Sequence, residues 1–510
     1  MRSKNLDLAL ETVHGVRWSY LSTVTHIILE IGVAAILARL LEPADFGIIA
    51  MSRVILHLGS FFARMGIGRA LVQKRELSNE ETRAAFTSSL ALGLLFFGLA
   101  WAIAPSVIYF FKNADVVPVI RIMALSFVLN GLSATAVGLL RRNLKFRSLA
   151  IAEIISYTIG YGVIAVFLAY TGFGLWSLVI SSLTQSIFLA VSAYLFCRHS
   201  LVFVYKWRYH KPLYTFGSRV SLISFLEFIG KRLGTLAIGH FIGAAVLGIY
   251  NRAFMLVNIP MENLILSTSR VVWPSFCRIQ KETQRLKRGY LSFAMVVVAF
   301  LIPACIGISI ASRELVLVIL GEKWIAAIPI LQLLAIAVLL DLLSHLLDVV
   351  YEAIAALNIR VFVHIGYIIF LGTLFYLVRG YGVIGFVSAL VIGALVRHIA
   401  YILIARVKLD INAKDIFTAY MPALVSGLLI GVSLYLVASF LRRAGLHVSL
   451  ILAAELITGF VLLIVMLFSR FQRETREEIL KILIKLRTLA EEKTFTAKLF
   501  DWLEKALTTK

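Results

Sequence analysis

Apolar stretches about 20 residues long follow one another along most of the chain, and short polar stretches separate them. A bilayer core about 30 Å thick takes about 20 helical residues to cross, so each stretch predicts a membrane-spanning helix. Helices satisfy their backbone polar groups within lipid, and the alternating pattern of a β-barrel is missing. We expect an all-α polytopic membrane protein with about 14 spans, at residues 16–40, 45–68, 85–110, 117–140, 149–171, 174–197, 214–238, 244–268, 289–311, 325–350, 359–379, 382–405, 416–440 and 447–469.

The composition agrees with this prediction. Of the 510 residues, 60% are apolar and 15% are charged, which excludes an ordinary soluble domain and a disordered chain. Lys and Arg number 50 against 28 Asp and Glu, a formal net charge of +22. In a membrane protein this excess indicates basic cytoplasmic loops, so we expect no nucleic-acid partner.

The loop charges orient the predicted spans. If the N-terminus is cytoplasmic and the first helix is retained, the inward segments carry 25 Lys and Arg and the outward connections carry seven. This asymmetry follows the positive-inside rule and predicts two cytoplasmic termini in the cytoplasmic membrane. The pair Arg442–Arg443, on the outward side, is the exception.

A weak internal repeat divides the chain. At an offset near 200, Ala44–Ile48 aligns with Ala245–Ile249, and Gly172–Gly174 aligns with Gly380–Gly382. Because each copy has six spans, the copies have the same orientation and are related by an axis along the membrane normal. The sequence predicts lobes at 1–200 and 212–408, two additional helices at 412–469 and an amphipathic cytoplasmic tail at 470–510, which lies on the membrane or contacts the protein.

Charged residues are unevenly spread over the spans. Mid-bilayer charges are costly, so they are expected to face a cavity or a partner. Spans three, five, six, nine and twelve are predicted to be almost purely apolar, whereas the first two helices of each copy carry polar stripes. At the 201-residue offset His26 matches Glu227, and Glu30 matches Lys231.

We interpret these stripes as a cationic cleft between two bundles, suited to a phosphate or an acidic sugar because Arg binds phosphate bidentately. Pairing within the stripes, such as Glu227 with Lys231, is the alternative. The predicted substrate-binding residues are Arg53, His57, Lys231, Arg232 and Arg252. A further stripe on span ten includes Asp341, His345 and Asp348, and it either couples ions or pairs with Arg on neighbouring helices. The candidates for ion coupling are Glu30, Glu227, Glu262, Asp341 and His345.

Several kinds of chemistry have no sequence signal. The chain lacks GxxxxGK[ST], HExxH and GxSxG motifs, and its cytoplasmic loops are too short for a transferase site. Three widely spaced cysteines indicate neither a disulfide framework nor a zinc site. We therefore expect a transporter with no catalytic residue, metal or cofactor.

Four segments resemble the bacterial polysaccharide transporters, whose superfamily also contains multidrug/toxin extrusion proteins and the lipid II flippase. Arg39–Gly47 looks like the RLLxPxDFG turn of that family, and the other segments are Gly66–Gln73, Leu140–Phe146 and Gly172–Val179. The resemblance covers roughly residues 10–410. These motifs are mostly structural turns, so the predicted binding residues depend on the cleft argument alone.

The resemblance implies an O-antigen-type flippase, similar to colanic or teichuronic acid exporters. Such a protein moves undecaprenyl-pyrophosphate-linked oligosaccharide between leaflets by alternating access for lipopolysaccharide or exopolysaccharide synthesis, and its expected partners are this lipid, the bilayer and polysaccharide polymerase or export proteins. Three alternatives stay open: a cation-coupled drug antiporter of the same fold, a lipid II flippase and a non-transporting scaffold. Fourteen spans and a basic cleft favour the flippase over the antiporter.

Overall fold

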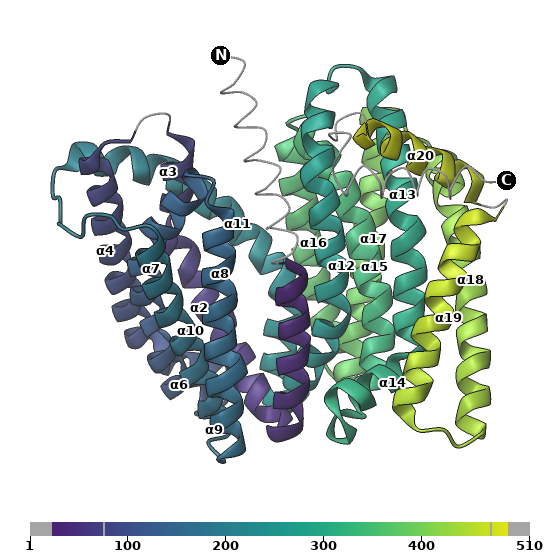
Figure 1. The fold of residues 1–510 in the computed structure, drawn as a ribbon, viewed down its shortest axis with the longest axis horizontal. Coiled ribbons are helices and arrows are strands. Elements are labelled where there is room, and N and C mark those ends of the chain that lie inside the picture. Colours follow the sequence, from purple (N-terminus) through teal and green to yellow (C-terminus); the bar gives the residue numbers. More distant parts are fainter. Residues whose placement is uncertain (1–22, 75–76, 470–471, 488–510) are drawn as a thin grey trace. The chain divides into compact units, whose positions relative to one another are not determined.

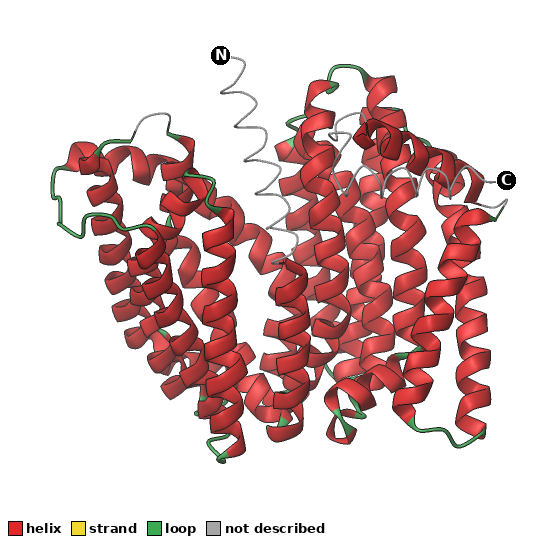
Figure 2. Ribbon diagram, in the orientation of Figure 1, coloured by secondary structure: helices red, strands yellow, loops and turns green. Residues whose placement is uncertain are grey.

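The computed structural model describes residues 23–74, 77–469 and 472–487. These residues are helices joined by short connections, and no strand occurs among them (Figure 2). Thirteen helices of the described part are long and apolar enough to cross a membrane. The predicted fold class is confirmed. The prediction of about 14 spans exceeds these thirteen helices because span seven is not among them. That span lies in the 35-residue helix α11 (Trp207–Phe241), many of whose side chains fall outside the described residues.

The chain divides into two compact units. Unit 1 comprises residues up to Arg252 together with Ile319–Trp324 and Arg379–Phe386, and unit 2 comprises the rest. The predicted lobes at 1–200 and 212–408 follow the sequence repeat instead, and they stay a prediction.

Unit 1 contains the spans of the first repeat (Figure 1). An N-terminal helix, Thr23–Leu40, precedes α2. The following elements are α2 (Pro43–Arg64), α3 (Ile67–Gln73), α4 (Asn79–Ile103), η1 (Ala104–Ser106), α5 (Val107–Phe111), α6 (Val116–Met123), α7 (Leu125–Arg142), α8 (Phe146–Tyr157), η2 (Thr158–Ala165), α9 (Val166–Tyr170), α10 (Leu175–Phe196), α11 and the start of α12 (Ala244–Arg278). The bundle is built on contacts of α7 with α4 and α10 and of α2 with α4, α6 and α11.

Unit 2 contains the rest of α12, most of the later spans and the tail helix. Its elements after α12 are α13 (Thr283–Ile310), α14 (Ser312–Leu315), η3 (Val316–Leu320), which continues into unit 1, α15 (Ala327–Ala353), α16 (Leu357–Val378), α17 (Gly382–Leu409), which begins in unit 1, α18 (Ala413–Arg443), α19 (Val448–Phe468) and α20 (Arg473–Arg487). The short 3-10 helix η4 (Glu322–Trp324) belongs to unit 1. Helix α13 packs against α15 and α18, and α18 and α19 form the last hairpin (Figure 1).

Two backbones meet in unit 1 where the sequence repeat aligns. A Cβ on Gly47 of α2 would lie 1.7 Å from the carbonyl oxygen of Ala244, and a Cβ on Gly248 of α12 would lie 1.8 Å from the carbonyl oxygen of Pro43. Only glycine permits such an approach. We call these four residues the glycine seam. It joins the start of α2 to the start of α12, and the contact is reciprocal because Gly47 and Gly248 are equivalent positions of the two copies.

Side chains of a later segment close over the same turn. The indole of Trp324 is fully buried, donates to the carbonyl oxygen of Ala38 at 2.9 Å and packs edge-on against Phe46 at 5.5 Å. Lys323 forms an ion pair with Glu42 at 2.9 Å. Helix α2 itself begins with Pro43 at its first position, and Asp45 accepts a hydrogen bond from the backbone N–H of Glu42 at 3.1 Å. The turn before α2 is thus a packed junction.

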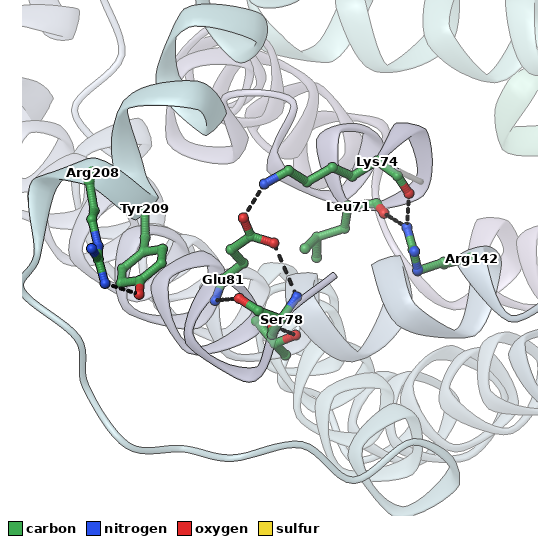
Figure 3. A network of polar contacts seen from close by, with 8 residues as sticks. Leu71, Lys74, Ser78, Glu81, Arg142, Arg208 and Tyr209 are labelled. Atoms are coloured by element: carbon green, nitrogen blue, oxygen red, sulfur yellow. Dashed lines mark hydrogen bonds and ion pairs between the residues drawn. The ribbon is translucent and has the colours of Figure 1, made fainter. Parts of the chain in front are cut away.

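A polar network holds the other end of the first repeat together (Figure 3). Arg142, the last residue of α7, donates to the carbonyl oxygens of Leu71, at 2.7 Å, and of Lys74. Lys74 pairs with Glu81, which also forms a capping box with Ser78 at the start of α4. Two segments of the family resemblance, Gly66–Gln73 and Leu140–Phe146, therefore contact each other.

The tail helix α20 contacts α13 and α19 of unit 2. Near its start, Thr475 is 1% exposed, and Gln472, just before α20, donates to the Ser426 hydroxyl at 3.1 Å. Helix α20 therefore contacts the protein, and the placement of the tail on the membrane stays a prediction. Residues 488–510 lie outside the described residues.

Candidate functional site

Polar side chains from three spans of unit 1 meet around Arg53 of α2. The guanidinium of Arg53 donates to the hydroxyl of Tyr161 and lies 5.9 Å from the centre of that ring. Tyr161 belongs to the π-helical segment η2 and stacks against Tyr157 of α8 at 5.3 Å. Segments of π-helix are rare and occur frequently at functional sites.

The N-terminal helix adds an ion pair to this group. His26 Nδ1 lies 3.7 Å from Glu30 Oε2, and both side chains are just over one third exposed. The His26 ring lies 4.8 Å from the ring of Tyr157, and Glu153 of α8 interacts with it electrostatically. The predicted shared face of His26 and Glu30 thus points at α8.

Arg252 of α12 completes the group. Its guanidinium lies 4.0 Å from the centre of the Phe46 ring, close enough for a cation–π interaction. It also interacts electrostatically with Arg53, Glu30, Tyr157 and Tyr161. We call Glu30, Arg53, Tyr157, Tyr161 and Arg252 the arginine cluster. All five lie within unit 1.

A second group forms around His57, one turn further along α2. Its ring stacks on Phe228 of α11 at 4.6 Å, with 10° between the planes. The guanidinium of Arg232 lies 6.0 Å from the same Phe228 ring, and Arg64 interacts electrostatically with His57. His57 and Arg232 are therefore neighbours. Lys231 is exposed on α11, and the side chain of Glu227 lies outside the described residues.

The remaining predicted residues lie in unit 2. Glu262 accepts a hydrogen bond from Asn258, one turn before it on α12, at 2.7 Å. Asp341 pairs with Arg397 of α17, and His345 is half-buried on α15. Glu262, Asp341 and His345 are therefore not part of the arginine cluster.

The stripe on α15 is met by arginines of the neighbouring helices. Asp348 lies 3.3 Å from Arg360 of α16 and accepts a hydrogen bond from Tyr401 of α17 at 2.6 Å. Arg360 also contacts Glu352 at 3.3 Å, and Arg397 lies 4.7 Å from the centre of the Tyr367 ring. These contacts are those expected from structural pairing, and the ion-coupling role of Asp341 and His345 stays a prediction.

Residues 36–329 match the family model described as polysaccharide biosynthesis protein. The chain belongs to this family. The matched segment contains every predicted substrate-binding cation from Arg53 to Arg252 and ends before Asp341 and His345.

Two relatives in the polysaccharide biosynthesis family illustrate the match. The chain is 26% identical to the lipopolysaccharide biosynthesis protein WzxC of Escherichia coli K12 over 66% of this chain and 68% of WzxC. It is 27% identical to the succinoglycan biosynthesis transport protein ExoT of Rhizobium meliloti over 64% of this chain and 66% of ExoT. Both names place these relatives in the synthesis of surface polysaccharides.

The fold of this family member is similar to that of the lipid II flippase MurJ in an inward closed conformation. The TM-score is 0.70 and the identity 14%, and the alignment covers 89% of this chain and 98% of MurJ. The similarity supports the fold and leaves the substrate undetermined.

Sequence reasoning missed part of the arginine cluster and part of the unit 2 network. Span five was predicted to be almost purely apolar, yet Glu153, Tyr157 and Tyr161 recur at four-residue spacing on it and face His26 and Arg53. Span twelve, predicted likewise, contributes Arg397. The spacing of the tyrosines was a usable signal, because i, i+4 and i+8 share one helix face.

Proposed function

We propose that this protein is a flippase that carries a polyprenyl-pyrophosphate-linked oligosaccharide across the cytoplasmic membrane for surface polysaccharide synthesis. The family, the names of the two relatives and the flippase fold support this assignment. The apolar helices support a multi-pass membrane location, and the distribution of Lys and Arg supports cytoplasmic termini.

The observation that carries the proposal is the arginine cluster. Two guanidiniums, Arg53 and Arg252, interact with each other within the span region, and the carboxylate of Glu30 interacts with Arg252. Like charges at membrane depth repel and are costly, so the pair favours an additional anion. A pyrophosphate carries several oxygens that accept from guanidinium donors, and Arg binds such groups bidentately. The hydroxyls of Tyr157 and Tyr161 add donors for phosphate or sugar oxygens.

The glycine seam supports transport by alternating access. The seam joins equivalent positions of the two sequence copies, and Lys323–Glu42 and Trp324 close over it. In our proposal these contacts seal one side of the substrate path, and they separate when that side opens. The lipid tail stays in the bilayer, because burying it in a polar path would cost its apolar transfer free energy.

The test replaces the cations singly, as Arg53→Gln and Arg252→Gln, with Arg443→Gln as the matched control on an exposed arginine of α18. In a flippase-null strain that the wild type restores, we expect the two cluster variants to lose most surface polysaccharide at normal protein levels. The control should retain it. Unchanged polysaccharide in both cluster variants would remove these arginines from the mechanism, and drug resistance without restored polysaccharide would favour the antiporter.

A further inference from the structure

A buried ion pair joins α14 to the end of α18 in unit 2. Arg442 donates from Nε to Glu314 Oε1 at 2.7 Å and from Nη2 to Oε2 at 2.8 Å. The Glu314 side chain is 1% exposed and that of Arg442 is 30% exposed. This bidentate geometry is the strong form of the pair and commits two guanidinium donors to one carboxylate.

A second carboxyl group lies beside this pair. Glu455, the eighth residue of α19, is 2% exposed. Among the residues that the structure describes, neither of its carboxyl oxygens has a hydrogen-bond partner. Glu455 interacts electrostatically with both Glu314 and Arg442. One cation thus faces two carboxyl groups, and its closest donors are used by Glu314.

Two of the titratable groups on the helices around Glu455 act on it. Helix α19 packs against α13, α14, α18 and α20. The titratable residues of these helices are Arg285, Lys287, Arg288, Tyr290 and Cys305 on α13, Arg313 and Glu314 on α14, Lys414, Asp415, Tyr420, Tyr435, Arg442 and Arg443 on α18, and Arg473, Glu474, Arg476, Glu477, Glu478, Lys481, Lys485 and Arg487 on α20. Of these, Glu314 and Arg442 interact electrostatically with Glu455. The charged residues of α20 follow the C-terminal end of α19, whereas Glu455 lies nearer the N-terminal end at Val448. Arg442 is therefore the cation that interacts with Glu455.

The charges of this cluster balance with one proton. If both carboxyl groups were ionised, the cluster would carry one net negative charge inside a membrane-spanning hairpin. An ionised group in a membrane-spanning segment is costly, and a like charge beside it adds to the cost. Uptake of one proton by Glu455 forms a single O–H bond and makes the cluster neutral.

We propose that Glu455 is a proton-binding site and that its proton secures α19 against α14. Loss of the proton leaves two carboxylates beside one guanidinium, so α19 separates from α14 or water enters. Glu455 and Arg442 lie on the two helices that follow both predicted sequence copies, Glu314 lies on α14, and the site shares no residue with the arginine cluster.

Infrared spectroscopy of the full-length protein in lipid nanodiscs tests this site directly. The difference spectrum of wild type minus Glu455→Gln at about pH 7 should show the carbonyl band of a protonated carboxyl group, because an ordinary Glu is ionised there. The band should disappear as the pH rises. Glu80→Gln, which removes an exposed carboxylate of α4, should leave the band unchanged.

A second variant keeps the test decisive if Glu455→Gln does not fold. Glu314→Gln leaves Glu455 as the single carboxylate beside Arg442, so the midpoint of the carbonyl band should fall by about 1 pH unit or more, a tenfold weaker proton affinity. Absence of the band from about pH 5 upward, or a midpoint that Glu314→Gln leaves in place, would overturn the proposal. A band that sodium ions abolish at constant pH would identify a sodium site and also overturn it.

Discussion

Gly47→Ala adds one methyl group at the glycine seam, where no room exists for it. The new Cβ would lie 1.7 Å from the oxygen, 2.5 Å from the carbonyl carbon and 2.9 Å from the Cα of Ala244. All three atoms are backbone, so no side-chain rotation relieves the contact. An ordinary contact needs ~3.5 Å, so α2 and α12 must separate by about 1.8 Å at this point.

The expected cost follows from two opposing effects. Overpacking of this kind costs about 1–3 kcal/mol. Replacing Gly by Ala inside a helix gains about 1 kcal/mol from helix propensity. Gly98→Ala in α4 provides the matched control, because a Cβ there meets nothing within 4 Å. Since the propensity gain is common to both variants, the difference between them isolates the clash at about 1–3 kcal/mol.

The assay is thermal unfolding of the purified protein in detergent, with restored surface polysaccharide as a second readout. Because the entropy of unfolding scales with the length of this 510-residue chain, we expect the Tm of Gly47→Ala to lie about 1–3 °C below that of Gly98→Ala. Gly248→Ala should behave like Gly47→Ala, because its Cβ would lie 1.8 Å from the carbonyl oxygen of Pro43. If Gly47→Ala and Gly98→Ala have the same Tm, the two backbones do not meet at the glycine seam and the reasoning fails.

Three further variants test the contacts around these sites. Arg142→Ala removes the donor to two backbone carbonyl oxygens at α3 and should lower the free energy of unfolding by about 1.5–3 kcal/mol. The control Arg198→Ala, at an exposed arginine, should change it little, and equal shifts in thermal unfolding would contradict the network. Trp324→Phe leaves the Ala38 carbonyl oxygen without its indole donor and should cost about 1–3 kcal/mol, which Trp273→Phe, at an exposed tryptophan, should not reproduce. Asp348→Ala leaves Arg360 with Glu352 as its remaining carboxylate and should cost up to about 3 kcal/mol, and a change no larger than that of Glu352→Ala would argue against the buried pair.

The membrane-spanning architecture could be predicted because hydropathy and length depend on local sequence alone. The predicted third and fourth spans, 85–110 and 117–140, lie within α4–α5 and α6–α7. Helices α4 and α2 begin at Asn79 and Pro43, before the predicted starts at 85 and 45, because Ser78 and Glu42 form capping boxes that hydropathy does not register. Local chemistry of this kind extends a helix past its apolar stretch.

The partners of the charged residues could not be predicted in the same way. Arg442, half of the pair that departs from the predicted charge asymmetry of the loops, pairs in the structure with Glu314, 128 residues earlier in the chain. The arginine cluster likewise needs Tyr161, which lies 108 residues from Arg53. Such pairs are set by helix packing, and periodicity within one helix gives only the face on which a partner will be found.

The sequence repeat nevertheless aligned two residues that lie in contact in the structure. Gly47 and Gly248 aligned at an offset of 201 residues, and the structure places each of them against the backbone that begins the other helix. Two positions that touch each other this closely must both be small, because a side chain on either one would enter the same narrow space. A shared glycine at corresponding positions of a sequence repeat can therefore indicate a contact between the two segments. The same reasoning gives Gly47→Ala combined with Gly248→Ala a specific expectation: once either methyl group has separated α2 from α12, the second adds less than its single cost. Unfolding free energies that simply add would show that the two contacts are separate.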